Sequence, residues 1–186
     1  MNNLTIAIDI DEVMAALHDR WLQLYRADYD DTLTSKDITH WNIEEIVKPE
    51  CGHGIFKYLD DPTLYHRVEP IEGALEGVNA LRQMGHRIVF ATCAHPDKAG
   101  HKYDWLIRQG FLPEGREHMK DYAPLMDKSL LACHILVDDF YKNFEEFGGH
   151  AILFKRPHNQ NRLRPLHQAE DWKHLVDIIK HNKWRV

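Results

Sequence analysis

A short apolar run near the start of the chain ends on two carboxylates, and this pattern restricts the fold more than any other. Residues 4–8 read Leu-Thr-Ile-Ala-Ile, and Asp9 and Asp11 follow. A continuous run rich in β-branched residues predicts a buried strand of a parallel sheet. Uncompensated charge inside a buried strand is very costly, so we expect Asp9 and Asp11 at its carboxyl end, where open α/β sheets bind ligands.

Strand and helix patterns alternate along most of the remaining chain. Further strands are predicted at residues 86–92, 133–139 and 150–154, the last of the series, with a short one near 116–119. Helical patterns are found at residues 13–26, 74–85, 98–109, 141–147 and 170–180. This alternation predicts an α/β fold with helices on both faces of a parallel sheet, and right-handed crossovers bring the carboxyl ends of the strands to one edge.

Two of the later strands also end in polar residues. One run ends on Thr92, and another ends on Asp138 and Asp139, shortly after Lys128. Because parallel strands end at the same edge of a sheet, we expect these side chains to meet the first pair of carboxylates there.

Four carboxylates in one crevice repel one another, and a hard divalent cation is the simplest remedy. Oxygen-only ligands favour Mg²⁺, which often bridges to a substrate phosphate. The Thr92 hydroxyl can donate to a phosphate oxygen, and Lys128 can neutralise charge on the phosphate and on a nucleophile. An aspartate beside a metal and a lysine can accept a phosphoryl group, and a second aspartate two residues later is within reach for acid–base work.

Residues 28–69 lack the alternation of strands and helices. They are polar and turn-like at first, then carry short helical pieces near 41–47 and 54–59. The stretch Pro70-Ile-Glu-Gly73 marks the return to the core pattern. We therefore predict a core of residues 1–16 and 70–186, with a small helical insertion, residues 17–69, after the first strand.

The composition narrows the possible partners and locations. A net charge of −6 argues against a stable nucleic-acid partner, because binding to a phosphate backbone depends on Lys and Arg. Three widely spaced cysteines, Cys51, Cys93 and Cys133, indicate no disulfide framework. With no apolar run long enough to span a membrane and no signal-peptide pattern, we expect a cytoplasmic protein.

The order of these residues resembles that of a known superfamily. Asp9-x-Asp11 after an apolar strand, Thr92 at the end of the next, then Lys128 and Asp138-Asp139 look like the four motifs of the haloacid dehalogenase (HAD) superfamily. Within it, the chain is most similar to the 5'(3')-deoxyribonucleotidases. The stretches that carry this likeness are Ile8-Asp-Ile-Asp-Glu-Val13, Ile38-Thr-His-Trp41, Asp61-Pro-Thr-Leu-Tyr65, Glu69-Pro-Ile-Glu-Gly73, Ala91-Thr-Cys-Ala94 and Lys128-Ser-Leu130.

The resemblance implies a three-layer Rossmann-like HAD core, with the insertion as a cap over the substrate. It implies that Asp9 is the nucleophile and a Mg²⁺ ligand, and that Asp11 is the general acid and base, with its backbone carbonyl on the metal. Thr92 and Lys128 would hold the phosphate, and the Asp138-Asp139 pair would complete the metal site.

The activity implied by the resemblance is that of a Mg²⁺-dependent phosphomonoesterase. It would dephosphorylate deoxyribonucleoside 5'(3')-monophosphates through an aspartyl-phosphate, as a monomer or homodimer, in deoxyribonucleotide breakdown. The same chemistry fits another small phosphate ester such as a sugar phosphate. A non-catalytic phosphate-ligand-binding protein is the alternative from a different class.

The sequence indicates the residues that contact the base and sugar of a nucleotide less clearly than those that bind its phosphate. Trp41, Phe56 and Tyr65 in the insertion, together with Cys93, are candidates. The alternative is that the aromatic side chains form the core of the cap and that Cys93 is a buried thiol. His95 is a further candidate because it closely follows Thr92.

The chain departs from the family pattern in places. Many relatives have Gly after the second Asp, where this chain has Glu12, and many have an Asp-Phe pair at what is here Ala16-Leu17. These changes leave the chemistry intact and bear on substrate fit. The basic segment 155–164 is either a solvated loop or a loop that reaches the active-site edge.

Overall fold

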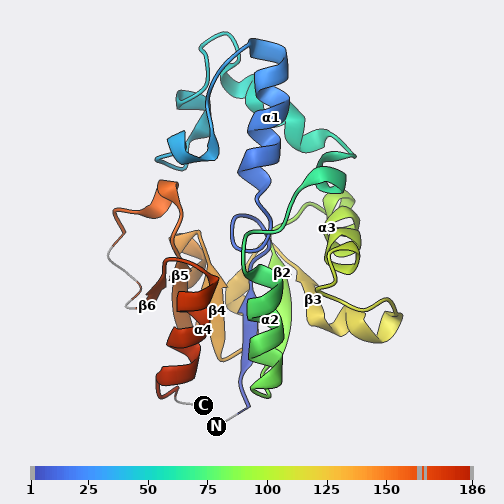
Figure 1. The fold of residues 1–186 in the computed structure, drawn as a ribbon, viewed down its shortest axis with the longest axis vertical. Coiled ribbons are helices and arrows are strands. Elements are labelled where there is room, and N and C mark those ends of the chain that lie inside the picture. Colours follow the sequence, from blue (N-terminus) through green and yellow to red (C-terminus); the bar gives the residue numbers. More distant parts are fainter. Residues whose placement is uncertain (1–2, 163–164, 166, 185–186) are drawn as a thin grey trace.

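The computed structural model describes residues 3–162, 165 and 167–184. In this part of the chain, six strands form a parallel sheet with the order β3-β2-β1-β4-β5-β6 (Figure 1). This confirms the predicted α/β fold. β1 lies between β2 and β4, so the residues that follow it stand near the middle of the carboxyl edge. The strands are β1 (Thr5–Ile8), β2 (Arg87–Thr92), β3 (Tyr122–Pro124), β4 (Ile135–Asp138), β5 (His150–Phe154) and β6 (His167–Ala169).

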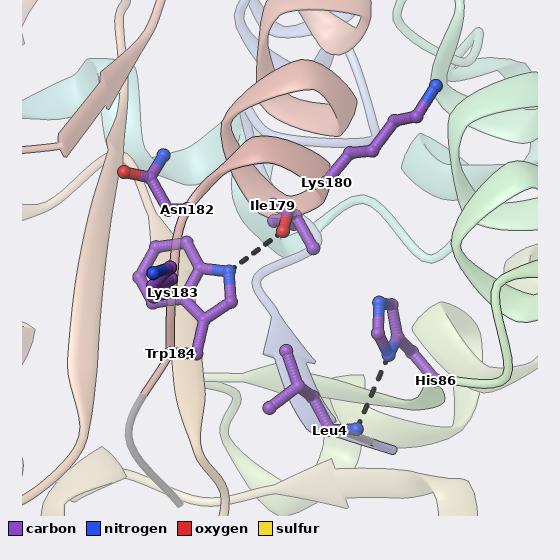
Figure 2. A pocket seen from close by; sticks show the side chains of 7 residues that line it. All are labelled: Leu4, His86, Ile179, Lys180, Asn182, Lys183 and Trp184. Carbon is purple, nitrogen blue, oxygen red and sulfur yellow. Dashed lines mark hydrogen bonds between the residues drawn. The ribbon is translucent and has the colours of Figure 1, made fainter. Parts of the chain in front are cut away.

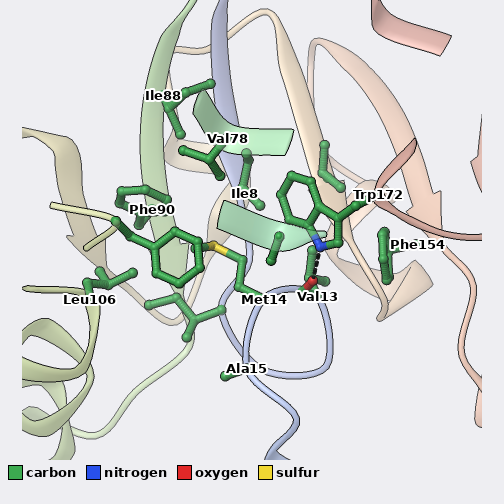
Figure 3. Close-up of a cluster of buried hydrophobic side chains, with 14 of the residues drawn as sticks. Ile8, Val13, Met14, Ala15, Val78, Ile88, Phe90, Leu106, Phe154 and Trp172 are labelled. Atoms are coloured by element: carbon green, nitrogen blue, oxygen red, sulfur yellow. Dashed lines mark hydrogen bonds between the residues drawn. The ribbon is translucent and has the colours of Figure 1, made fainter. Parts of the chain in front are cut away.

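The large apolar core lies between one face of the sheet and three helices, α2 (Ala74–Gln83), α3 (Pro96–Arg108) and α4 (Trp172–His181). Side chains alternate between the two faces of a strand, and Ile6 and Ile8 of β1 point into this core. Figure 3 shows Trp172 of α4 beside the turn that follows β1, where its indole N–H donates to the Val13 carbonyl at 2.8 Å. That bond ties α4 to the segment that carries the first motif.

The opposite face of the sheet is covered by a thinner layer. The residues that point to it from the central strands include Ala7 and Ala91, whose small side chains let irregular segments approach closely. Leu125, Leu131, Phe144 and Phe147 pack there, on or beside two short 3₁₀ helices, Lys128–Leu130 and Tyr141–Phe144.

The insertion stands over the carboxyl edge of the sheet, with α1 (Leu17–Tyr29) leading into it at the top of Figure 1. It has its own small core, in which Trp21 and Tyr25 of α1 pack against Ile38 and Ile55. The chain leaves and re-enters the core at adjacent points, since Ala16 N donates to Glu69 O at 3.0 Å. Short 3₁₀ helices make up most of the rest: Ser35–Asp37, Ile43–Glu45, Gly52–Asp60 and Leu64–Arg67.

Two strand predictions were wrong. Residues 116–121 form a 3₁₀ helix, and the short strand is Tyr122–Pro124 instead. His150–Phe154 is not the last strand, because β6 follows it at the sheet edge. Both β3 and β6 have three residues, too few to show an alternating pattern in the sequence.

Two helix predictions also need correction. The helix predicted from Val13 begins at Leu17, because residues 10–15 form a tight turn in which Met14 N donates to Ile10 O at 2.9 Å. The segment 141–147 holds only the 3₁₀ helix Tyr141–Phe144. Its apolar residues are anchored in the thin layer and do not form a continuous helical face.

A cavity of about 270 Å³ lies at the amino-terminal edge of the sheet, opposite the carboxyl edge that holds the aspartates (Figure 2). His86, just before β2, accepts a hydrogen bond from Leu4 N through Nδ1 at 3.3 Å. The indole N–H of Trp184, just after α4, donates to Ile179 O at 2.8 Å. None of the helices in the described ranges is both long enough and apolar enough to cross a membrane.

Candidate active site

Three aspartates and one lysine meet at the carboxyl edge of the central strands. Asp9 directly follows β1, Asp138 ends β4, and Asp139 comes next. Lys128 forms ion pairs with Asp9 and with Asp138, whose Oδ2 lies 2.5 Å from Nζ. All four side chains are buried.

The electrostatics of this cluster favour a bound cation. Burial raises the pKa of Asp9 and of Asp139 well above the ordinary value, and the neighbouring Asp138 carboxylate adds to both shifts. Burial would favour neutral Lys128, but the Asp138 and Asp9 carboxylates outweigh it and raise its pKa. One ammonium group therefore faces three buried carboxyl groups, and the fully ionised cluster would carry two more negative than positive charges. A bound cation would allow all three to ionise.

The donor set suits a hard divalent ion. One carboxylate oxygen from each of Asp9, Asp138 and Asp139 can be chosen so that all three lie within 4.8 Å of one another. An all-oxygen set of this kind fits Mg²⁺, which takes oxygen ligands and keeps several waters. Asp138 is held in place by hydrogen bonds from Phe140 N and Asn143 Nδ2, both at 2.9 Å.

Asp11 stands apart from that cluster and has its own partners. The Tyr65 hydroxyl donates to Asp11 Oδ1, and Lys102 Nζ lies 2.5 Å from Oδ2. Lys102 also donates to Thr92 Oγ1 at 2.8 Å. Thr92 is fully buried, so in this structure it joins the site through Lys102.

Lys102 and the hydroxyl of Tyr65 were not anticipated as partners of Asp11. Tyr65 was a candidate for the substrate wall, and the structure buries its ring and directs its hydroxyl to the Asp11 carboxylate. Lys102 lies on α3, whose helical pattern in the sequence gave no sign that one lysine points inward. The feature of the sequence that could have identified Lys102 is its position on the helix that follows the strand ending at Thr92.

A cavity of about 400 Å³ opens above the carboxylates, between the cap and the core. Trp21 and Trp41 of the cap line it, together with Phe140 and Cys93 of the core. Trp41 stacks on Phe140 with ring centroids 4.0 Å apart and an interplanar angle of 20°. The Trp41 side chain is 56% exposed, so it does not belong to the core of the cap.

The other candidate contacts lie in neighbouring spaces. Phe56 packs against Trp21 and lines an adjoining cavity of about 200 Å³. Tyr65, Cys93 and His95 line another of about 180 Å³, beside Asp11. Cys93 therefore borders both the main cavity and this one, and burial raises the pKa of its thiol.

The described part of the basic segment reaches the active-site edge. Lys155 is buried and donates to Gln160 O at 2.7 Å, so it is not a solvated side chain. His158 Nε2 lies 3.0 Å from Asp139 Oδ2, and burial lowers the pKa of His158 to about 4. Residues 163 and 164 lie outside the described ranges.

The fold is that of solved hydrolases of the HAD family. A HAD family hydrolase from Deinococcus radiodurans, solved with bound phosphate and sodium, superposes with a TM-score of 0.63 over 95% of each chain, at 13% identity. A putative HAD hydrolase from Bacillus subtilis bound to magnesium gives 0.56 over 96% of this chain and 99% of that chain, also at 13% identity.

Residues 2–184 match the family model "5' nucleotidase, deoxy (Pyrimidine), cytosolic type C protein", and the chain belongs to that family. A 5'(3')-deoxyribonucleotidase of Clostridium acetobutylicum is 31% identical over 195 residues, covering 97% of this chain and 98% of that protein. The protein is therefore a phosphoric monoester hydrolase.

Proposed function

We propose that this enzyme is a Mg²⁺-dependent phosphatase of deoxyribonucleoside 5'(3')-monophosphates that works through an aspartyl-phosphate on Asp9. The observation that carries the proposal is the meeting of Asp9, Lys128 and Asp138 at the floor of a cavity with aromatic walls. The floor suits a phosphate and a cation, and Trp41 and Phe140 suit a flat base.

Asp9, Asp138 and Asp139 would hold the metal ion, and the bound ion would supply positive charge to the transferring phosphoryl group. The Asp9 carboxylate attacks phosphorus, and the bond from phosphorus to the sugar oxygen breaks. Asp11, held by Tyr65 and Lys102, gives its proton to that oxygen.

The second half of the reaction restores the enzyme. Asp11 takes a proton from water, whose oxygen attacks phosphorus and breaks the bond to Asp9. Inorganic phosphate leaves, and Asp9 is again a carboxylate. Lys128 remains charged beside Asp9 and offsets negative charge throughout.

The cap assists both halves of the reaction by covering the site. Its Trp41 contacts Phe140 of the core across the cavity, which limits access of bulk water during the first half of the reaction. A cytoplasmic location is part of the proposal and is supported by three free thiols, Cys51, Cys93 and Cys133.

Phosphate release from a panel of monophosphates tests the proposal. We expect release from deoxyribonucleoside 5'- and 3'-monophosphates with Mg²⁺ and none with a chelator present. Asp9→Asn should abolish it, whereas Asp97→Asn, an exposed carboxylate on α3, should not. Release from sugar phosphates alone would overturn the substrate, and release by Asp9→Asn at the wild-type rate would overturn the nucleophile.

The covalent step has its own test. With p-nitrophenyl phosphate, whose leaving group needs no acid, Asp11→Asn should form the aspartyl-phosphate and hydrolyse it slowly. Intact-protein mass spectrometry should then show one added phosphoryl group, and Asp9→Asn should show none. Substrate turnover by Asp11→Asn with no adduct at any time point would argue for direct attack by water.

A further inference from the structure

Glu12 occupies a position that is unfavourable for a glutamate in two respects. Its backbone has φ +56°, the left-handed region that favours glycine and costs other residues of order 1 kcal/mol or more. Its side chain is buried, with 2% of the residue exposed, and a buried carboxylate is costly unless it is paired. A strained residue beside the acid–base aspartate persists when the surroundings give it a role.

The Glu12 carboxylate joins three separate segments of the chain. Arg156, in the loop after β5, donates to Glu12 Oε2 from Nη2 at 2.6 Å and from Nε at 2.9 Å. The backbone N–H of His18, in the first turn of α1, donates to Oε1 at 2.7 Å. Glu12 thus connects the turn after β1, the entrance to the cap and the loop after β5.

The loop that Arg156 anchors also supports Asp139. Arg156 N donates to Asn159 Oδ1 at 3.0 Å, and Asn159 Nδ2 donates to the Asp139 carbonyl at 2.8 Å. From the same loop, His158 faces the Asp139 side chain at 3.0 Å. The backbone carbonyl of Asp139 is therefore held by a residue three positions from Arg156, and the His158 ring lies beside its carboxylate without a hydrogen bond to it.

We propose that Glu12 and Arg156 are positioning residues whose ion pair fixes Asp139 relative to Asp9 and Asp138 and thereby sets the affinity for the divalent cation. The inference rests on the metal dependence proposed above. Neither residue needs to touch the substrate. Partners of this kind behind metal ligands commonly change metal affinity 10- to 100-fold when they are removed.

Titration of the purified, substrate-free protein with Mg²⁺ tests this, with calorimetry giving the Kd. We expect Glu12→Gln and Arg156→Gln each to weaken binding by about tenfold. The double variant should be weakened no further than either single one, because both remove the same ion pair. Arg156→Lys should recover part of the affinity, and it also serves as the milder variant if Arg156→Gln does not fold.

Arg162→Gln is the matched control, because that guanidinium lies in the same loop but stacks on Tyr141, 3.8 Å from the ring centroid. Its Mg²⁺ affinity should equal that of the wild type. A purely structural ion pair would lower the melting temperature and leave the Kd within twofold, and that result would overturn the inference. If the wild type itself binds no Mg²⁺, the metal dependence in the proposed function fails and the inference fails with it.

Discussion

Lys102 Nζ lies 2.5 Å from Asp11 Oδ2, so a buried ammonium group on α3 is in direct contact with the candidate acid–base carboxylate. The same nitrogen donates to Thr92 Oγ1 at 2.8 Å. An ammonium group has donors only, so the Thr92 oxygen accepts this hydrogen bond. Lys102 therefore orients two groups of the site at once.

Replacing Lys102 with methionine should lower kcat/KM for a deoxyribonucleoside monophosphate by about 100-fold, because Asp11 would lose the group that orients it and acid–base catalysis typically contributes about 100-fold or more. Lys102→Arg should retain part of the activity, because it keeps the charge. The measurement is steady-state phosphate release at saturating Mg²⁺.

The matched control is Lys98→Met, one turn earlier on α3, where the ammonium pairs with Asp60 of the cap at 3.1 Å. Its kcat/KM should change by less than about fivefold, because partly exposed ion pairs contribute at most ~1 kcal/mol. If Lys102→Met and Lys98→Met lower kcat/KM equally, the contact of Lys102 with Asp11 does not contribute to catalysis.

Mg²⁺ should stabilise the fold, because the carboxylate cluster carries an uncompensated negative charge. At a free concentration 100 times the Kd, binding to the native state alone adds about 2.7 kcal/mol to the free energy of unfolding. Thermal melts with Mg²⁺ and with a chelator should differ accordingly. Asp138→Asn should remove most of the difference, and an equal response in that variant would show that the ion binds elsewhere.

The motif residues at the strand ends follow from the sequence because topology alone brings them together. Asp9 and Asp138 end adjacent parallel strands, so their meeting requires only that both strands belong to one sheet. Thr92 follows by the same argument from β2. Side chains that arrive from helices and loops do not follow in this way.

Lys102 and Arg156 illustrate that limit. The direction of a helical side chain depends on how the helix rotates against the sheet, and the pattern of α3 does not specify which lysine turns inward. Arg156 lies in a segment whose basic composition also suits a solvated loop, and its partner Glu12 is 144 positions away. Such pairings are set by tertiary packing, which the spacing of one sequence does not encode.

Protonation of His86 should weaken the fold below neutral pH. Burial lowers the pKa of His86 from its ordinary 6.5, and the neutral ring accepts a hydrogen bond from Leu4 N. The unfolded chain therefore binds the proton more readily than the native state. The stability contributed by neutral His86 is complete above pH 6.5 and is lost as the pH falls towards the lower native pKa.

Urea unfolding between pH 5 and pH 7.5, compared for wild type and His86→Gln, isolates this effect from those of other titrating groups. The pH dependence should be shallower in His86→Gln. His53→Gln, which alters a side chain that is 87% exposed, should keep the wild-type dependence. Identical slopes for His86→Gln and wild type would show that this histidine is not coupled to folding.

Two helical glycines should respond to alanine in opposite directions. In an exposed helix interior, Gly→Ala stabilises by about 0.5–1 kcal/mol. Gly100 of α3 has no atom within 4 Å of where a Cβ would lie, so Gly100→Ala should show that gain. At Gly77 of α2, a Cβ would lie 2.3 Å from Trp172 Cε3 of α4.

Gly77→Ala must therefore push α2 away from the Trp172 ring, which is buried and also bonded to Val13. Overpacking of this kind typically destabilises a protein by about 1–3 kcal/mol, which exceeds the stabilisation that alanine provides over glycine in a helix. Midpoints of urea unfolding should fall for Gly77→Ala and rise for Gly100→Ala. A rise in both would mean that α4 can shift to admit a methyl group, and the close contact between α2 and α4 would then not be a fixed part of the fold.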